Sequence, residues 1–262
     1  GFIDITNHSD THLTLFKYPT LDSMLMQGVT TIIGGNCGGS LAPLASETAL
    51  NVIKKWADPS EINRDWSTTE EYLKSMEDIR PALNYGTLAG FGTLRRGVIG
   101  DEVRELTFEE REKLKHMLED SMDQGAFGLS LGLAYGHEYV SSTEEIIEIA
   151  KVLREKEGIV KIHLRSEGSG IIAAVNEAVR IARESGVAVI ISHVKTIGRK
   201  ARSHFPKALD IISRARSSGV NIAFDVSPYR ATGSPLYTLI PGWAREGGFK
   251  ELFRRLRDSG ER

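Results

Sequence analysis

The chain has 262 residues, with 33 basic and 35 acidic side chains and a formal net charge of −2. This balance indicates no nucleic-acid partner, and since no apolar run reaches about 18 residues, no membrane-spanning helix is predicted. Cys37 is the only cysteine, which excludes an internal disulfide and fits a reducing compartment, so we expect a cytoplasmic protein.

Continuously apolar, β-branched segments alternate along the chain with segments of helical character. Such runs are typical of parallel strands that are buried on both faces of a sheet. The expected strands are Phe2–Asn7, Val29–Asn36, Leu83–Gly92, Ala126–Leu133, Gly158–Leu164, Ala188–Val194 and Asn221–Val226.

The intervening segments carry start and stop signals of helices. A hydroxyl residue three positions before Glu has the spacing of a capping box. This pattern occurs at Ser67–Glu70, Thr107–Glu110 and Ser142–Glu145. Gly125, Gly186 and Gly219 each lie just before the next strand, where a left-handed residue commonly ends a helix.

Polar residues gather directly after the expected strands. They are His8, Asp10, Asn36, Cys37, His163, Arg165, His193, Lys195, Asp225 and Tyr229. In a barrel all of these strand ends meet at one face, whereas an open doubly wound sheet spreads them along an edge. We therefore predict an α/β protein with an incomplete (β/α)₈ TIM-type barrel of about seven strands, lacking the last strand.

Cys37, His163 and His193 follow three different strands of this predicted barrel. One thiolate and two imidazoles suit Zn²⁺, and three protein ligands leave a position open, as in catalytic zinc sites. A buried cysteine and capped strand ends are the alternative for each residue taken alone. Their joint position at strand ends favours a metal site.

His8 is a further candidate ligand after the first strand. Thr6 shares its face of the strand, because residues two apart point the same way. Thr6 is a weaker zinc ligand than imidazole. The other histidines are expected in loops, in a charged helix or in polar stretches, and they are His12, His116, His137 and His204.

Several motifs, in order across nearly the whole chain, resemble one enzyme family. The most discriminating are N-C-G at Asn36, H-x-R-x-E-G from His163 and S-H-x-K from Ser192. With GFIDITNHSD, GTLRRGVIG and FDVSPY they resemble the N-acyl-D-amino-acid deacylases (D-aminoacylases) of the amidohydrolase superfamily. The resemblance implies a metallo-dependent hydrolase that cleaves the amide bond of N-acyl-D-amino acids, a small-molecule substrate.

The resemblance also implies roles for individual residues. Cys37, His163 and His193 would hold one tightly bound zinc, and Lys195 would bind the substrate carboxylate, with Ser234 as a lesser candidate. Ser227 of Ser227-Pro228-Tyr229 stands where the family commonly has a carboxylate-binding tyrosine. The family usually has H-x-H where this chain has Thr6-Asn7-His8, so a second, weaker metal site is in doubt. Phe91 replaces a histidine that is often found there.

The family's catalytic aspartate belongs to an eighth strand, which we expect beyond Arg262. Residues 1–262 are thus expected to be a partial barrel domain, without that strand and without a small flanking β-domain, and to be inactive alone. Asp225 is the strand-end carboxylate within the chain that could serve instead. The alternatives are a cyclic amidohydrolase of the dihydroorotase or hydantoinase kind, and a non-catalytic barrel that binds a ligand.

Overall fold

The computed structural model describes residues 1–227, 229, 231–245 and 247–261, with only the backbone of Gly242 and Phe249. Pro228 of the Ser-Pro-Tyr motif, and Arg262, lie outside the described residues. Across these ranges, parallel strands form two sheets. The smaller sheet has the order β1 (Phe2–Asp4), β2 (Val29–Gly34), β3 (Asn84–Thr87), and the larger has the order β4 (Ala89–Gly90), β5 (Gly128–Gly132), β6 (Ile159–His163), β7 (Ala188–Ile191), β8 (Ile222–Phe224).

Helices connect successive strands, except that Leu88 alone joins β3 to β4. The longer helices are α3 (Thr69–Ile79), α4 (Phe91–Ile99), α5 (Phe108–Asp123), α7 (Thr143–Ala150), α8 (Ile171–Ser185), α9 (Phe205–Ser217) and α11 (Gly248–Arg257). The short ones are α1 (Thr14–Lys17), α2 (Asp22–Leu25), α6 (Gly136–Tyr139) and α10 (Gly242–Arg245). Single 3₁₀ segments are η1 (Glu47–Val52), η2 (Pro59–Glu61), η3 (Lys151–Arg154), η4 (Arg199–His204) and η5 (Leu236–Leu239).

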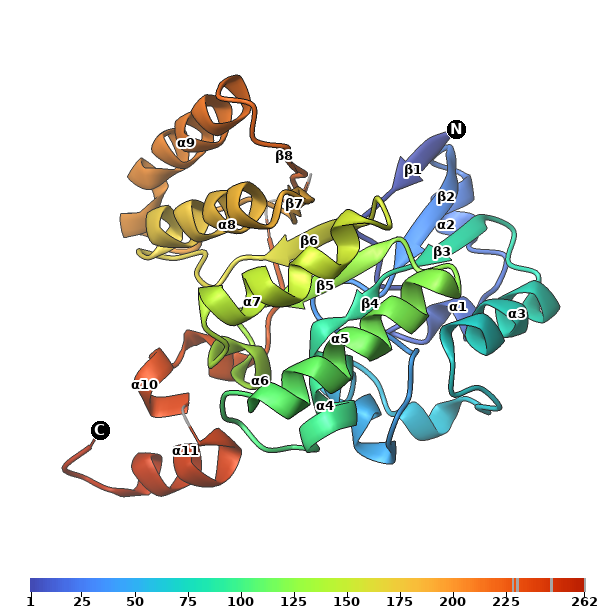
Figure 1. The fold of residues 1–262 in the computed structure, drawn as a ribbon, viewed down its shortest axis with the longest axis horizontal. Coiled ribbons are helices and arrows are strands. Elements are labelled where there is room, and N and C mark those ends of the chain that lie inside the picture. Colours follow the sequence, from blue (N-terminus) through green and yellow to red (C-terminus); the bar gives the residue numbers. More distant parts are fainter. Residues whose placement is uncertain (228, 230, 246, 262) are drawn as a thin grey trace.

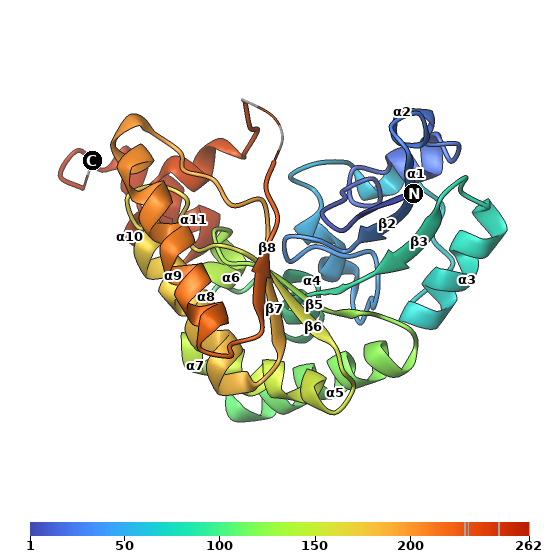
Figure 2. The same cartoon turned by 90° about the horizontal axis from the view of Figure 1, so that it is seen from above.

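The strands follow one another in chain order within each sheet, and every pairing is parallel. Helices α5, α7, α8 and α9 succeed each other along the outer side of β5–β8 (Figure 2). Since parallel strands all end at the same edge, the loops that follow them lie together there. This confirms the α/β fold with parallel sheets; the described strands do not close into a barrel.

The predicted bounds of the third strand were wrong. The segment Leu83–Gly92 divides at Leu88: β3 pairs with β2, and β4 pairs with β5, so the chain changes sheets there. Leu88 donates its N–H to the carbonyl of Gly34 at 3.1 Å. Phe91 and Gly92 begin α4 instead of ending a strand. One expected strand thus supplies a segment to each sheet, which makes eight segments among the described residues rather than seven.

The capping signals are confirmed at two of the three sites and displaced by one residue at the third. Thr107 and Ser142 accept hydrogen bonds from the N–H groups of Glu110 and Glu145. Before α3 the cap is Thr68, paired with Glu71. The stop signals also hold, because Gly125, Gly186 and Gly219 all have positive φ.

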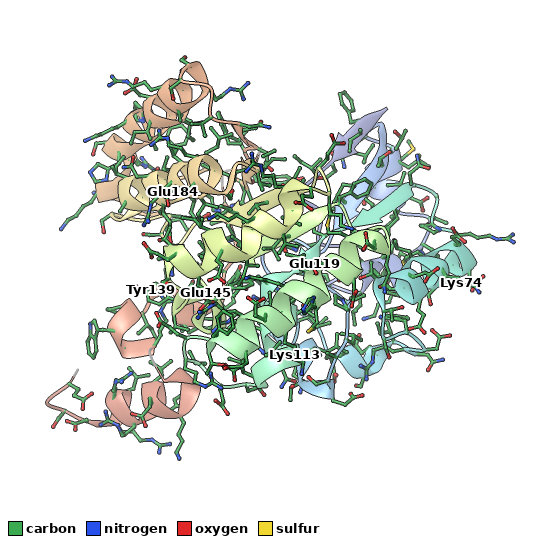
Figure 3. The ribbon with its side chains drawn as sticks, in the orientation of Figure 1. Lys74, Lys113, Glu119, Tyr139, Glu145 and Glu184 are labelled. Atoms are coloured by element: carbon green, nitrogen blue, oxygen red, sulfur yellow. The ribbon has the colours of Figure 1, made fainter. Side chains whose placement is uncertain are left out.

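Two hydrophobic cores lie under the two sheets. The core of the larger sheet is almost entirely aliphatic, with Leu, Ile, Val and Ala from β4–β8 and from α4, α5, α7, α8 and α9. The core of the smaller sheet contains Trp66 and Tyr72 beside leucines. Charged residues such as Lys74, Lys113 and Glu184 project from exposed helix faces, whereas Glu145 is buried (Figure 3). Within the ranges given above, no helix combines the length and the apolar character needed to cross a membrane.

Candidate metal centre

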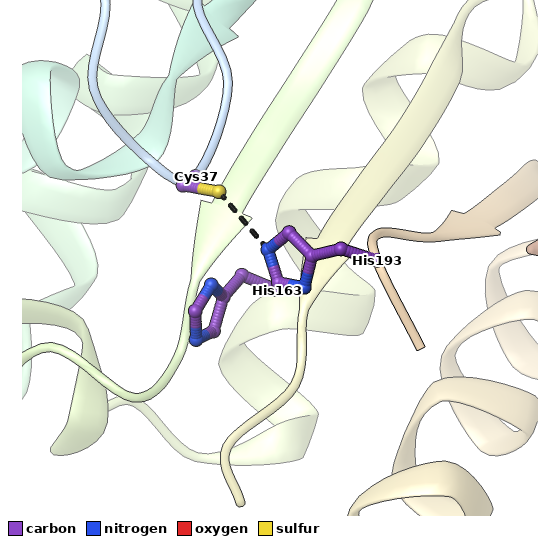
Figure 4. Close-up of side chains that lie close together, drawn as sticks. All are labelled: Cys37, His163 and His193. Carbon is purple, nitrogen blue, oxygen red and sulfur yellow. Dashed lines mark hydrogen bonds between the residues drawn. The ribbon is translucent and has the colours of Figure 1, made fainter. Parts of the chain in front are cut away.

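The structure brings Cys37, His163 and His193 together (Figure 4). Cys37 lies in the loop after β2, His163 ends β6, and His193 follows β7. One ligand atom from each lies within 4.8 Å of the others, and Cys37 Sγ is 3.5 Å from His193 Nε2. These strand ends, far apart in the sequence, thus meet at one place, as the sequence predicted.

His8 is placed beside this cluster. Its Nε2 lies 3.5 Å from Cys37 Sγ, and its Nδ1 lies 3.3 Å from Thr11 Oγ1. Among the described residues, the three-residue group alone has metal-ligand spacing. His8 is therefore a neighbour of the cluster and the nearest further nitrogen donor.

The electrostatics of the cluster favour a thiolate. Burial alone would raise the pKa of the Cys37 thiol, but the charge of His8 and hydrogen bonds from His163, His193 and His8 hold it well below its ordinary value. For His193 burial acts in the opposite direction and would lower the pKa, but hydrogen bonds to Cys37 and Glu167 raise the pKa to about 9. The thiolate is the form of cysteine that ligates metals.

The backbone at the cluster adopts left-handed conformations. Cys37 has φ 53° and His193 has φ 40°, both uncommon for residues with a Cβ. The loop approaches β4 so closely that a Cβ at Gly35, which has φ +72°, would clash with the carbonyl oxygen of Leu88. A glycine is therefore needed at position 35 for the loop to lie this close to Leu88.

The donor set fits a zinc ion. Cys37 is 5% and His163 6% exposed, so both are largely shielded from water. Nδ1 of His163 is buried, and no described group hydrogen-bonds to it. A buried imidazole nitrogen without a partner, beside a cysteine with a lowered pKa and a second imidazole, is the ligand chemistry that Zn²⁺ prefers.

Glu167 and Lys195 form an outer layer around His193. Glu167 Oε1 lies 3.0 Å from His193 Nδ1, and Lys195 Nζ lies 2.6 Å from the same carboxylate oxygen. Burial would raise the pKa of Glu167, but His193, His163 and Lys195 lower it to about 2. A carboxylate on the second nitrogen fixes the tautomer and orientation of a ligand histidine. Arg165 lies apart and pairs with Glu177 at 2.7 Å.

The other substrate-binding candidates are not part of this layer. Ser227 and Ser234 are exposed, and Ser227 Oγ accepts the N–H of Tyr229 at 3.4 Å. Phe91 is fully buried in the core of the larger sheet. The three positions where the chain departs from the family pattern thus differ: Phe91 packs in the core, Ser227 is exposed, and Thr6 lies at the site.

Sequence reasoning missed a polar group beneath the cluster. Lys161, on β6, is only 1% exposed; its Nζ contacts Thr6 Oγ1 and lies 2.8 Å from Asp225 Oδ2. Asp225 also accepts hydrogen bonds from the hydroxyl of Thr6 at 2.6 Å and from the N–H of His193 at 2.5 Å. A lysine inside the apolar run Ile159–His163 was the signal that could have revealed it.

A cavity of about 590 Å³ adjoins the cluster through Tyr135. The ring of Tyr135 lies 5.1 Å from that of His163, and Lys55 Nζ lies 3.2 Å over the tyrosine ring. Burial lowers the pKa of Lys55 to about 8. Five lysine and arginine side chains, Arg96 and Arg245 among them, line the cavity against two acidic ones, Asp101 and Glu138, so its charge favours an anionic organic molecule.

The remaining histidines lie away from the three-residue cluster. His12 stacks on Trp56, with ring centroids 5.4 Å apart, and His116 lies 3.1 Å from Glu119 on α5. His137 hydrogen-bonds to the carbonyl of Gly100 at 2.9 Å. His204 ends η4 and is half-buried.

The structure thus combines parallel α/β sheets with a cysteine and two imidazoles at their carboxyl edge, a donor set suited to a divalent metal ion. No family model matches the chain. It is 35% identical over 237 residues to N-acyl-D-aspartate deacylase and 34% identical over 236 residues to D-aminoacylase, both of Alcaligenes xylosoxydans xylosoxydans. Each alignment covers 90% of this chain but only 47% or 48% of the relative, so the chain spans about half the length of the curated relatives it matches.

Solved structures agree. A D-aminoacylase studied for its binuclear metal center superposes with a TM-score of 0.80 at 34% identity, covering 87% of this chain and 47% of the other. N-acyl-D-glutamate deacylase from Bordetella bronchiseptica, complexed with zinc and a phosphonate inhibitor, gives 0.78 at 32% identity, with the same coverage. The chain is thus a homologue of the N-acyl-D-amino-acid deacylases, which confirms the resemblance in its motifs.

Proposed function

We propose that this chain forms the metal-binding part of a zinc-dependent hydrolase that cleaves the amide bond of N-acyl-D-amino acids into a D-amino acid and a carboxylic acid. The observation that carries the proposal is the Cys37–His163–His193 cluster, within 4.8 Å, in a homologue of such deacylases. We propose one tight zinc at these three residues, with His8 as an adjacent donor. The partner would be the small-molecule substrate alone, and a cytoplasmic location stays a prediction from the single cysteine.

The fold supports a barrel. Strand order is sequential and parallel, β3 and β4 pass from one sheet to the next through Leu88 alone, and the match to D-aminoacylase extends over 87% of the chain. We propose that residues 1–262 belong to a (β/α)₈ TIM-type metallo-dependent hydrolase barrel. β3 and β4 count as one strand of that barrel, so the described residues supply seven. The barrel's eighth strand, which is not the element labelled β8, and the flanking small β-domain would then correspond to parts of the relatives that this chain does not span.

In this scheme, a bound zinc would supply Lewis acidity, polarising the substrate carbonyl and lowering the pKa of water toward ~7. Glu167, 3.0 Å from His193 Nδ1, would hold a metal-bound His193 with its Nε2 toward the site. Lys195 carries a positive charge and lies beside Glu167. In this position it would bind the substrate carboxylate. Ser227 and Ser234 remain predicted contacts of that carboxylate.

Proton transfer needs a further carboxylate. Asp225 is held by Lys161, Thr6 and the His193 N–H, and Glu167 is held by His193 and Lys195. Both carboxylates already accept hydrogen bonds from these groups, so they are poorly placed to take a proton from water. We propose that the acid–base residue comes from the eighth strand.

The direct test is hydrolysis of N-acetyl-D-methionine, N-acetyl-D-aspartate and N-acetyl-D-glutamate by the full-length gene product, with each L-enantiomer as control. We expect turnover of at least one D-substrate and about one zinc per chain by elemental analysis. Cys37→Ser and His163→Asn should abolish both, whereas His116→Asn, on the exposed side of α5, should abolish neither. A folded, metal-free protein without turnover would contradict the proposal and favour a non-catalytic ligand-binding barrel.

A further inference from the structure

Lys161 stands out because a lysine is very rarely so buried without a partner or a task. It lies two residues before His163 on β6, so both side chains point to the same side of the sheet. Its amine contacts the hydroxyl of Thr6 and, at 2.8 Å, the carboxylate of Asp225. Residues that follow β1 and β8 thus converge on one buried amine in the middle of β6.

The Lys161 amine lies among the groups that a second metal ion would need as ligands. A second divalent ion beside the cluster would share Cys37 and draw on the nearest further donors. The nitrogen is His8 Nε2, 3.5 Å from Cys37 Sγ. The hydroxyl of Thr6, two residues before His8, and the carboxylate of Asp225, which accepts the N–H of His193, are oxygen donors beside these residues. Lys161 is already bonded to both.

We propose that the amine of Lys161 takes the place that a second metal ion would need, so that the site accepts one metal ion and holds a fixed cation where a second would bind. This inference rests on the proposed metal site at Cys37, His163 and His193. Lys161 neutralises Asp225, and a second ion would have to displace a buried ion pair and meet a like charge at short range.

Lys161 is also a positioning residue for one ligand. Asp225 accepts the backbone N–H of His193 at 2.5 Å, and His193 is the residue with the left-handed φ of 40°. The amine orients the Asp225 carboxylate, and the carboxylate holds the His193 backbone. A metal ligand thus depends on a lysine that does not touch the metal.

The test is a cobalt titration of the metal-free full-length gene product, followed by visible absorption and by elemental analysis. We expect saturation at one equivalent in the wild type. Lys161→Met, which keeps the length but removes the charge, should weaken the affinity for the first equivalent by roughly 10- to 100-fold. Lys156→Met removes a lysine whose Asp123 pairing is exposed, and should leave the titration unchanged.

The double variant Thr6→His, Lys161→Ala restores an imidazole and frees the Asp225 carboxylate, so we expect it to take up a second equivalent. Wild-type saturation at two equivalents, or one equivalent in a folded double variant, would overturn the role of Lys161 while leaving the first site intact. Zero equivalents in the wild type would overturn the proposed metal site itself. The wild-type titration needs no variant to fold, so the inference can fail even if both variants are unstable.

Discussion

The two halves of the molecule are built differently. The larger half, β4–β8 with α4–α9, repeats strand and helix regularly and packs an aliphatic core. The smaller half, β1–β3 with α1–α3, has two one-turn helices, 3₁₀ segments between β2 and α3, and a core with Trp66, Tyr72 and Tyr85. In the larger half, the strand and helix periods determine which way side chains point. In the smaller half, contacts of individual loops determine it.

The candidate metal centre uses both halves. His163, His193 and Asp225 come from the ends of regular strands and Lys161 from within β6, whereas Cys37, His8 and Thr6 come from the smaller half. The Cys37 loop is fastened across the boundary, because the N–H of Gly38 donates to Ser130 Oγ on β5 at 3.1 Å. The larger half therefore supplies a rigid frame, and the smaller half supplies a thiolate that is correctly placed only when the two halves pack together.

The largest expected effect on stability lies in the larger half, at the buried ion pair of Arg95 and Glu145. Their side chains are 0% and 4% exposed, and Nη1 lies 2.5 Å from Oε1. Glu145→Gln leaves a buried guanidinium without its counter-charge, so we expect the free energy of unfolding to fall by about 3 to 5 kcal/mol. Urea denaturation followed by circular dichroism would measure it.

The adjacent residue provides the matched control. Glu144 precedes Glu145 on α7 and pairs with Arg180 at 2.7 Å, but both side chains are exposed. Water and salt screen such a pair, so Glu144→Gln should leave the denaturation midpoint within error. Equal losses in the two variants would show that burial does not set the strength of these pairs.

A smaller effect is expected from His137, on α6 at the edge of the larger half. Burial, together with the charges of Arg96 and Arg95, lowers its pKa to about 3, so the folded chain keeps this imidazole neutral. The unfolded chain binds a proton below pH ~6.5. Stability from this residue is therefore complete above that pH and is lost as the pH falls toward 3.

Between pH 7 and pH 5 this loss should reach about 2 kcal/mol in the free energy of unfolding. His137→Gln removes the titrating group and should flatten that part of the stability profile. His116→Gln, on the exposed face of α5, should retain the wild-type profile. An unchanged slope in the His137 variant would mean that this imidazole does not control acid stability.

The smallest effect belongs to the smaller half. Tyr85 and Tyr72 share a hydrogen bond of 2.8 Å between hydroxyls, and Tyr85 lies 3.4 Å from the buried Asp10 carboxylate. Asp10 in turn accepts the N–H of Gly35, two residues before Cys37. Tyr85→Phe removes one hydroxyl and should lower the free energy of unfolding by about 1 kcal/mol.

The exposed Tyr18 serves as the control, because Tyr18→Phe removes a hydroxyl that water replaces. If Tyr85→Phe lowered the free energy of unfolding as much as Glu145→Gln, the proposed difference between the two halves would be wrong. Such a loss would show that the loop contacts of the smaller half are as costly to disturb as the buried charges of the larger one.

The sequence by itself determined the regular part of this protein. Apolar runs and glycine stops located every strand of the larger sheet except β4, because burial on both faces and helix termination are local in sequence. The same reasoning identified Cys37, His163 and His193 as a set, since parallel strands end at one edge. It also expected His8 nearby, where the structure places it.

Only the tertiary structure decided the contacts between the halves. The break at Leu88 depends on which strand each segment pairs with, and a helix-containing segment separates each partner strand from Leu88. Glu167 on His193, and Lys161 between Thr6 and Asp225, depend on side-chain direction at strands far apart in the chain. A periodic sequence pattern predicts which face of a strand or helix a residue occupies. Which residue it contacts on that face depends on how the elements pack.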